Sequence, residues 1–309
     1  MKFVFFGTRE LAAKVLERLL QAGYSPAFVV TGPDRPAGRK QKLTASPVKE
    51  VALHHNLPLA QPEDPKELLS RSELKEAEFF VVAAYGNILP KELIELPPKG
   101  VLNVHPSLLP LYRGPAPERG VLLSGDKKTG VTVIFVDEKV DHGPIVAKEE
   151  FSIPEDMRHE ELHLKLGEIG GQLLVKTIPL WLQGKITPKE QDHSKATFTK
   201  KAKKEDGRID WSKEAQYITR QIRAFYPWPG TYTLWQEKLV KVLQAKAIDT
   251  PEEYQEAKSG TVFSFQKQFA VVTGKQSLLV EQLQLAAGNP MPSQDFLLGH
   301  KDFLGTILK

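Results

Sequence analysis

An amide and an imidazole stand two positions apart in the segment NVHPSLLPLYRG, residues 103–114. They are Asn103 and His105, and they close a short apolar run. On a strand, residues i and i+2 project to the same face, so both side chains are expected to point together. An amide can donate hydrogen bonds to a developing oxyanion, and a histidine can move protons near neutral pH. The pair predicts acyl transfer without a covalent intermediate; a buried structural amide and a satisfied histidine are the alternative.

A carboxylate that could hold the imidazole in place and favour its charged form stands in VDHGPI, residues 140–145. Asp141 is the preferred candidate, because Gly143 and Pro144 fix a turn immediately after it. Asp137, four residues earlier, is the competing candidate.

Short apolar runs alternate with amphipathic stretches through the first 185 residues. The runs predict buried parallel strands at Lys2–Phe6, Ala27–Val30, Glu78–Ala84 and Val101–Val104. The stretches predict helices at Glu10–Ala22, Pro47–His55, Pro65–Leu74 and Pro90–Leu96. Two more strands, at Gly130–Asp137 and Pro144–Ile153, precede a long helix from about Glu155 to Gln183. This succession indicates an α/β fold with a doubly wound, Rossmann-like, mostly parallel sheet, whose ligands bind beyond the carboxyl ends of its strands.

The polar segment from Gly184 to Lys204 has no periodicity and predicts a domain boundary. We expect a catalytic domain at 1–184, a basic linker at 185–205 and a C-terminal domain at 206–309. That domain would open with a helix at Glu214–Phe225, and the short alternating segments beyond it predict a small OB-like β-barrel.

The composition is that of a folded protein with room for two domains, because 41% of the 309 residues are hydrophobic and 26% are charged. There is no cysteine, which excludes disulfides, thiolate metal sites and cysteine nucleophiles. No apolar run approaches the roughly 18 residues that span a bilayer. We therefore expect a cytoplasmic protein.

The excess positive charge sits in one place. The formal net charge is +4, and the segment KATFTKKAKK, 195–204, holds five lysines and no acid, so the rest of the chain nets −1. Such a run is usually a solvated linker, but it is also what a surface that binds nucleic-acid phosphates requires.

Two further motifs suggest other functions, but the sequence supports neither of these functions well. FFGTREL, in the first strand-to-helix turn, has one glycine where a dinucleotide fingerprint needs three, so a nicotinamide dehydrogenase is poorly supported. HEELH, 159–163, matches a zinc-protease pattern. It is better explained as the start of an amphipathic helix with Leu162, Leu166, Ile169 and Leu173 buried, and we expect no metal.

The chain resembles the methionyl-tRNA formyltransferases over essentially its whole length. The resemblance is carried by residues 29–52, 81–114, the turn VDHGP and residues 206–232. NVHPSLLP with the following aspartate marks the wider family of 10-formyltetrahydrofolate-dependent formyltransferases. PDRPAGR and RIDWS…IRAFYPWPG are typical of the branch that acts on tRNA, although some sugar-nucleotide formyltransferases share much of both.

The resemblance implies roles for three groups of residues, with 10-formyltetrahydrofolate as co-substrate and methionyl initiator tRNA as acceptor. We also expect a monomer. Asn103, His105 and Asp141 are similar to the catalytic trio. The folate-binding residues would be Ser107, Leu108, Leu109, Pro110, Tyr85, Gly86, Asn87 and Ile88. The tRNA-binding residues would be Arg35, Arg39, Lys40, Lys42, Lys200, Lys201, Lys203 and Lys204.

Some positions depart from the family pattern. His142 stands where threonine is usual, Lys139 where glycine is common, and Leu111 where a basic residue often follows SLLP. These departures leave the packing around Asp141 open. Three other functions also stay open: a sugar-nucleotide N-formyltransferase, a 10-formyltetrahydrofolate hydrolase, and a non-catalytic RNA-binding protein.

Overall fold

A computed structural model describes residues 1–37, 42–286 and 288–309. Its internal contacts divide the chain into two compact units. Unit 1 contains residues 1–117, 127–153 and 161–200, and unit 2 contains residues 118–126, 154–160 and 201–309. Unit 1 is built on a mostly parallel α/β sheet and unit 2 on an antiparallel sheet, so the predicted fold class is confirmed.

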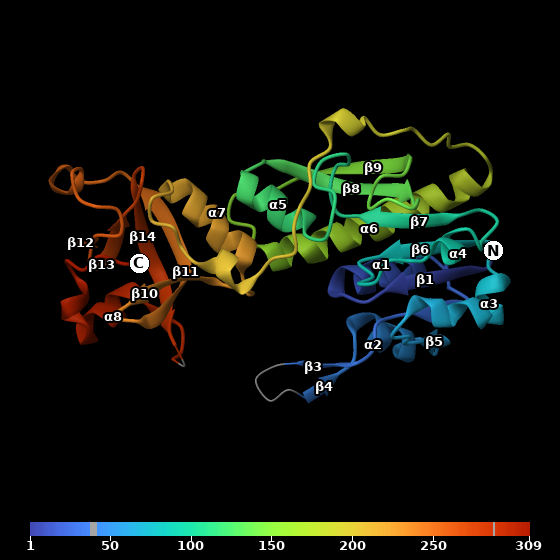
Figure 1. Cartoon of the computed structure of the whole chain (residues 1–309), viewed down its shortest axis with the longest axis horizontal. Helices are drawn as coiled ribbons and strands as arrows, with labels where there is room; N and C mark the ends of the chain where they lie inside the picture. The colour runs from blue at the N-terminus through green and yellow to red at the C-terminus, as the bar shows by residue number, and fades with distance from the viewer. Residues whose placement is uncertain (38–41, 287) are drawn as a thin grey trace. The chain divides into compact units, whose positions relative to one another are not determined.

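The sheet of unit 1 has seven strands in the order β5-β2-β1-β6-β7-β8-β9 (Figure 1). The first five in this order pair in parallel, whereas β8 and β9 are antiparallel to their neighbours. The strands are β1 (Phe3–Gly7), β2 (Phe28–Val30), β5 (Leu59–Ala60), β6 (Phe79–Ala83), β7 (Val101–His105), β8 (Lys128–Phe135) and β9 (Ile145–Ser152).

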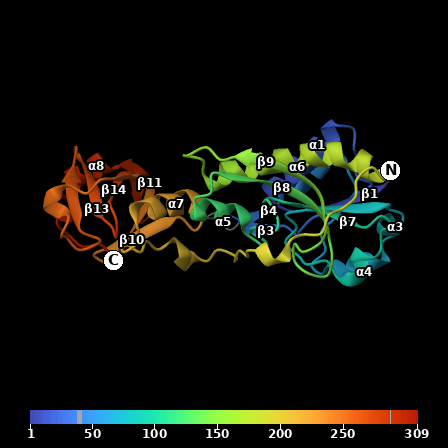
Figure 2. The same ribbon diagram turned by 90° about the horizontal axis from the view of Figure 1, so that it is seen from above.

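Both faces of the central strands are buried, which explains their continuous apolar runs. Alternate residues serve opposite faces: Phe6 joins a core cluster with Phe80, while Phe3 stacks on Phe79 at 5.3 Å between ring centroids. Helices α1 and α6 cover the Phe3 face, and α3 and α4 cover the other (Figure 2). The sheet is therefore held rigidly between two layers.

The helices between residues 1 and 184 begin and end close to the predicted positions, with three differences. The described helices of residues 1–184 are α1 (Glu10–Gln21), α2 (Pro47–His54), α3 (Ser72–Lys75), α4 (Lys91–Ile94), α5 (Pro117–Ser124) and α6 (His159–Leu182). Of these, α5 was not predicted, and its residues from 118 onward belong to unit 2. The single helix predicted at Pro65–Leu74 is wrong, because a capping box between Asp64 and Glu67 starts a 3₁₀ helix at Pro65–Ser70 and Arg71 is extended before α3. The long helix starts at His159 rather than near Glu155.

Glycines let α6 lie directly against α1. A Cβ atom at Gly167 would stand 2.8 Å from the Leu11 carbonyl oxygen, and one at Gly171 would stand 2.5 Å from Arg18 Cβ. The positions predicted to be buried in this helix, Leu162, Leu166, Ile169 and Leu173, are buried. This close packing fixes α6 against the face of the sheet beneath β7 and β8.

A short antiparallel hairpin carries the basic insert of unit 1. Its strands are β3 (Arg35–Ala37) and β4 (Lys42–Thr44). Residues 38–41, between the two strands, lie outside the described residues, and so do Arg39 and Lys40 with them.

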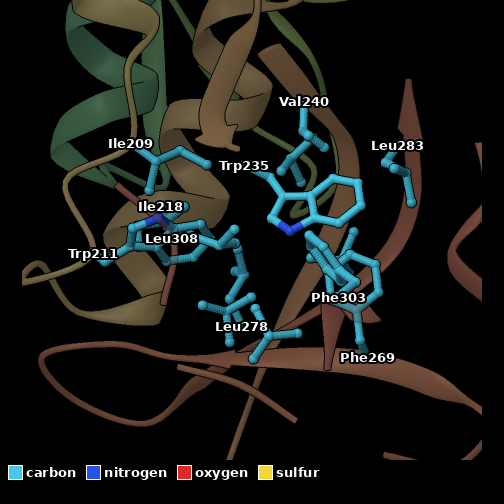
Figure 3. Packing of buried hydrophobic residues seen from close by; sticks show 14 of the residues in the cluster. Ile209, Trp211, Ile218, Trp235, Val240, Phe269, Leu278, Leu283, Phe303 and Leu308 are labelled. Carbon is cyan, nitrogen blue, oxygen red and sulfur yellow. The ribbon is translucent and has the colours of Figure 1, made fainter. Parts of the chain in front are cut away.

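The antiparallel sheet of unit 2 follows the order β10-β11-β14-β13-β12, with β15 on β14. Its elements are α7 (Ala215–Phe225), β10 (Thr231–Trp235), β11 (Lys238–Ile248), β12 (Val262–Phe265), β13 (Gln268–Val272), β14 (Ser277–Leu285), β15 (Met291–Pro292) and α8 (Ser293–Gly299). The core is one apolar cluster in which Trp235, Phe269 and Phe303 lie together and Trp211 packs with Leu308 (Figure 3).

Residues 305–309 close this sheet. On one side, Gly305 and Leu308 donate through their backbone N–H groups to Val262 and Gly260, and Val262 donates to Thr306. On the other side, Lys309 and Leu234 exchange backbone hydrogen bonds at 3.1 and 3.4 Å. The segment thus bridges β12 and β10, the two edges that the strand order leaves open.

Among the described residues, no helix combines the length and the apolar composition that crossing a bilayer would require.

Deletion of residues 305–309 tests this closure. We expect the deletion to lower the free energy of unfolding of unit 2 by about 3 kcal/mol or more, since it removes backbone hydrogen bonds and the buried Leu308 side chain. Ile307→Ala is the matched control, because the Ile307 side chain is more than half exposed and its backbone bridge remains. Thermal denaturation measures both; equal melting temperatures for the deletion and the control would contradict the closure.

Candidate functional site

The candidate site lies where the strand order reverses. The chain runs from β1 to β2 and β5 on one side and then returns to β6 and β7 on the other. Ligands of open α/β sheets bind outside the carboxyl ends of the strands at such a reversal. The loops after β6 and β7 start at adjacent positions there, because Ala83 pairs with Val104.

Asn103, His105 and Asp141 meet at the end of β7. Asn103 Nδ2 donates to Asp141 Oδ1 over 3.3 Å, and His105 Nδ1 lies 3.4 Å from the same oxygen. His105 Nε2 lies 3.0 Å from the Tyr112 carbonyl oxygen. Each ring nitrogen of His105 therefore faces an oxygen that can accept a hydrogen bond from it.

Asp141 is a nearly buried carboxylate with several donors. Besides Asn103 and His105, the backbone N–H of Gly114 donates to its second oxygen over 2.8 Å. Burial raises the pKa of the Asp141 carboxyl, but His105, the Gly114 N–H and the Arg113 charge together hold this pKa below its ordinary value. The group is therefore ionised at neutral pH and fixes the imidazole beside it.

The competing carboxylate belongs to a different contact. Asp137 accepts from the backbone N–H of Lys139 and from His142 Nδ1, at 2.9 and 2.7 Å. The turn then places Asp141 at φ +50°, in the left-handed region, and brings Gly143 against the backbone of Phe135, where a Cβ would stand 2.0 Å from its oxygen. This geometry faces Asp141, rather than Asp137, toward His105.

The SLLP loop is fixed by a threonine from the neighbouring strand. Thr132 on β8 donates its hydroxyl to the Ser107 carbonyl oxygen over 2.7 Å and accepts from the Leu109 N–H over 3.1 Å. Ser107 Oγ donates to the Leu111 carbonyl oxygen over 2.6 Å, and Lys148 Nζ donates to the Leu109 carbonyl oxygen. Ser107 and Leu109 are fully buried, so they shape the loop from within.

The loop after β6, residues 85–88, is mostly exposed rather than packed in the core. Tyr85 packs edge-on against Phe6, at 5.6 Å between ring centroids. Residues Gly86 to Ile88 are exposed, and the apolar Ile88 side chain is 82% exposed. An exposed apolar side chain beside the carboxyl ends of β6 and β7 suits a pocket wall that is completed by a ligand.

The basic residues predicted to bind tRNA differ in their surroundings. Arg35 is exposed on β3 and donates to Glu63 over 2.8 Å, and Lys42 is exposed on β4. Lys200, Lys201, Lys203 and Lys204 are all exposed, and within the described parts of the chain none of their side chains forms an ion pair. Arg39 and Lys40 lie outside the described residues.

The HEELH motif falls at the start of α6. Its second histidine is already engaged, because the Leu11 N–H donates to His163 Nε2 over 3.3 Å. His159 belongs to unit 2 and His163 to unit 1, and we assign the pair no site.

Two residues that support the site, Thr132 and Gln191, were not predicted from the motifs or the periodicity of the sequence. Thr132 had a usable signal, since it is a polar residue within a buried apolar run. Gln191 had none, because it stands in a polar segment without periodicity; it is buried and contacts the Asp141 turn. Arg113 stands in the NVHPSLLPLYRG segment and is also buried.

Comparison with known proteins gives full-length matches. The profile of the formyl transferase family matches residues 1–178, and that of the formyl transferase C-terminal domain matches residues 201–301. A methionyl-tRNA formyltransferase of Chloroflexus aurantiacus is 44% identical over 308 residues, 98% of each chain. One of Halalkalibacterium halodurans is 43% identical over 306 residues, 97% of this chain and 95% of the relative.

Two solved structures share the fold at low identity. An N-formyltransferase from Helicobacter canadensis, in complex with folinic acid and dTDP-3-aminofucose, matches with a TM-score of 0.68 at 18% identity, over 91% of this chain and 98% of that one. HypX from Aquifex aeolicus, in complex with tetrahydrofolic acid, matches with a TM-score of 0.65 at 17% identity, over 99% of this chain and 48% of that one.

The low pKa of Asp141 predicts a pH-dependent contribution to stability. A carboxyl whose pKa is lowered by folding stabilises the fold above its unfolded pKa, about 3.9, and this contribution is lost as pH falls through the folded pKa. We expect Asp141→Asn to cost about 1–3 kcal/mol at neutral pH and less as pH drops below about 4. Urea unfolding of both proteins across that range measures the difference; a cost that stays constant with pH would contradict the assignment.

Proposed function

Because the chain belongs to the methionyl-tRNA formyltransferase family, we propose that it transfers the formyl group of 10-formyltetrahydrofolate to the α-amino group of methionyl initiator tRNA. The observation that carries the proposal is the meeting of Asn103, His105 and Asp141 at the carboxyl end of β7. This arrangement supplies a hydrogen-bond donor, a proton carrier and a carboxylate, which are the groups that acyl transfer to an amine requires.

In the proposed reaction, the free α-amine attacks the formyl carbon carried by N10 of the folate. Its reference pKa is near 8, so a useful fraction is uncharged at neutral pH. Asn103 has two N–H donors; one is directed at Asp141, and the other steadies the oxyanion of the tetrahedral intermediate. The amine loses one proton and N10 gains one as the C–N10 bond breaks, and His105 carries this proton while Asp141 orients the ring.

The folate would bind between the loops after β6 and β7. The SLLP loop is held from beneath by Thr132, so its backbone keeps one shape toward the ligand. The loop from Tyr85 to Ile88 provides the opposite, partly apolar wall. Backbone groups and apolar packing of this kind are how buried small-molecule sites usually recognise a planar ring.

The tRNA would bind through exposed basic residues. Lys200, Lys201, Lys203 and Lys204 are exposed and form no ion pairs within the described part of the chain, so their charges are available to phosphates. Arg35 and Lys42, on the β3–β4 hairpin, form a second basic group, to which the sequence adds Arg39 and Lys40. Contacts of this kind position a tRNA without reading its sequence.

Replacement of His105 tests the proposed reaction. We expect His105→Ala to lower kcat by about 10²–10⁴-fold, since the proton transfer loses its carrier. The control is His55→Ala, which removes an exposed histidine at the end of α2. Formylation of methionyl initiator tRNA is measured with 10-formyltetrahydrofolate as donor; unchanged turnover in His105→Ala would rule out the proton-carrying role.

The same assay separates the other functions. The purified protein is given the donor with charged initiator tRNA, charged elongator tRNA, an amino-sugar nucleotide, or no acceptor. Preference for initiator tRNA is the expected result. Formylation of the sugar alone, donor hydrolysis without acceptor, or tRNA binding without turnover would each overturn the proposal in favour of one alternative.

Replacement of Lys200, Lys201, Lys203 and Lys204 by glutamine tests the tRNA-binding surface. We expect tRNA affinity to fall and the slope of log affinity against log salt concentration to become shallower, by about 0.7–0.9 for each phosphate that a lysine no longer neutralises. The matched control replaces four exposed lysines of unit 1 outside this surface: Lys66, Lys75, Lys99 and Lys185. An equal change of slope in both variants would show that the effect comes from net charge alone and would contradict a tRNA-binding surface at these four lysines.

A further inference from the structure

The segment from Gln191 to Thr199, which we name the docking segment, contacts the site along its length although the sequence predicts it as linker. Its backbone pairs with the loop after SLLP: Arg113 donates to the Thr197 carbonyl oxygen over 2.8 Å, and Thr199 donates to the Arg113 carbonyl oxygen over 2.7 Å. Thr197 Oγ1 also accepts from the Tyr112 N–H. The docking segment therefore fixes the backbone that carries the Tyr112 and Gly114 contacts of the trio.

Gln191 is the point at which the docking segment reaches the Asp141 turn. Its amide nitrogen donates to the carbonyl oxygens of Asp141 and Gly143, over 3.0 and 2.8 Å. Its amide oxygen accepts from Nε and Nη2 of Arg113, over 3.2 and 2.6 Å. The side chain is buried, and these four contacts satisfy both polar atoms of its amide inside the protein.

These contacts act on a turn that needs support. Asp141 lies at φ +50°, a conformation that costs an L-residue about 1–2 kcal/mol. Two hydrogen bonds from Gln191, to the carbonyls on either side of His142, restrain the turn in that conformation. The carboxylate of Asp141 then points at Asn103 and His105 rather than into solvent.

The neutrality of Gln191 matters because Arg113 is a buried cation. Gln191 satisfies two of its donor groups without cancelling its charge, and Nη2 also donates to His193 Nδ1 over 2.9 Å. The uncancelled charge helps to hold the pKa of Asp141 low. A carboxylate in place of Gln191 would pair with Arg113 in the same geometry but would neutralise it.

We propose that Gln191 is a positioning residue for Asp141, and that the reaction requires a neutral amide at position 191 to hold the turn and to leave the Arg113 charge uncancelled. The inference rests on the proposed formyl transfer. It adds to that reaction a residue which touches no substrate and acts through Asp141.

Two substitutions separate the two parts of this role. Gln191→Glu keeps an acceptor for Arg113 but loses both donors and cancels the charge, whereas Gln191→Met fills the same space and loses all four hydrogen bonds. The control is Glu190→Gln, at the exposed neighbouring residue. We expect kcat to fall about 10- to 100-fold in both variants, with KM for tRNA and folate nearly unchanged, because the trio is misplaced while binding surfaces remain.

The pH profile distinguishes positioning from a general loss of structure. The charged and titratable groups that face Asp141 or its turn are His105, Arg113, His142 with Asp137, and His193 beside Arg113. We divide kcat/KM by the uncharged fraction of the substrate α-amine, and we expect the acid limb that remains to move to higher pH in Gln191→Glu, where the Arg113 charge is cancelled. The acid limb should stay in place in Gln191→Met, where the Arg113 charge remains, and in the control Glu190→Gln.

A second measurement needs no turnover. Carbon-13 NMR of the Asp141 carboxyl reports its pKa directly, and this pKa should rise in Gln191→Glu and stay low in the control. Absence of turnover in the unaltered protein would overturn the proposed function but leave this titration decisive for Gln191. A kcat within twofold of the unaltered protein in both variants, a change confined to KM, or an unchanged Asp141 pKa in Gln191→Glu would overturn the inference. If Gln191→Met does not fold, Gln191→Glu carries both readouts.

Discussion

The site depends on one buried carboxylate and its donors. Moving an ion out of water costs several kcal/mol, even after the protein relaxes around it. Asp141 recovers this cost through Asn103, His105 and the Gly114 N–H, each bond to a charged acceptor contributing about 1.5–3 kcal/mol. Because these donors come from β7 and from the loop beyond it, the carboxylate can stay buried and ionised only while strand and loop keep their places.

The same contacts couple stability to chemistry. Asn103 and His105 are the donors that stabilise Asp141 in the fold, and they are also the donors proposed to act on the substrate. The reacting groups are therefore oriented before any ligand arrives, and little reorganisation is left for the transition state. Thr132 extends this preorganisation to the SLLP loop, because one hydroxyl bonds both Ser107 and Leu109. Neighbouring strands of the sheet thus position both parts of the site: β7 carries Asn103 and His105, and β8 carries the Thr132 that holds the SLLP loop.

Local patterns in the sequence predict what depends on local contacts. The buried strands follow from their apolar runs, and the shared direction of Asn103 and His105 follows from the two-residue period of a strand. The Gly143–Pro144 turn identified Asp141, although no pattern could place it beside a residue 38 positions earlier. Gln191 and residues 305–309 have no periodic signal, since their roles are side-chain bonds and edge pairings with distant segments. The 3₁₀ helix at Pro65–Ser70 was missed because a capping box overrode the apolar spacing.

The stacking of His142 on His193 adds to the attachment of the docking segment without touching the Asp141 carboxylate. His142 donates to Asp137 and stacks on His193, with ring centroids 4.0 Å apart and planes within 5°. Stacked aromatic pairs contribute about 0.5–1.5 kcal/mol beyond the area they bury. His193 in turn accepts from Arg113, so the stack adds a second connection between the turn and the segment that supplies Gln191. The His142 ring bonds Asp137, whereas Asp141 is held by other donors, so the stack supports the turn without competing for the Asp141 carboxylate.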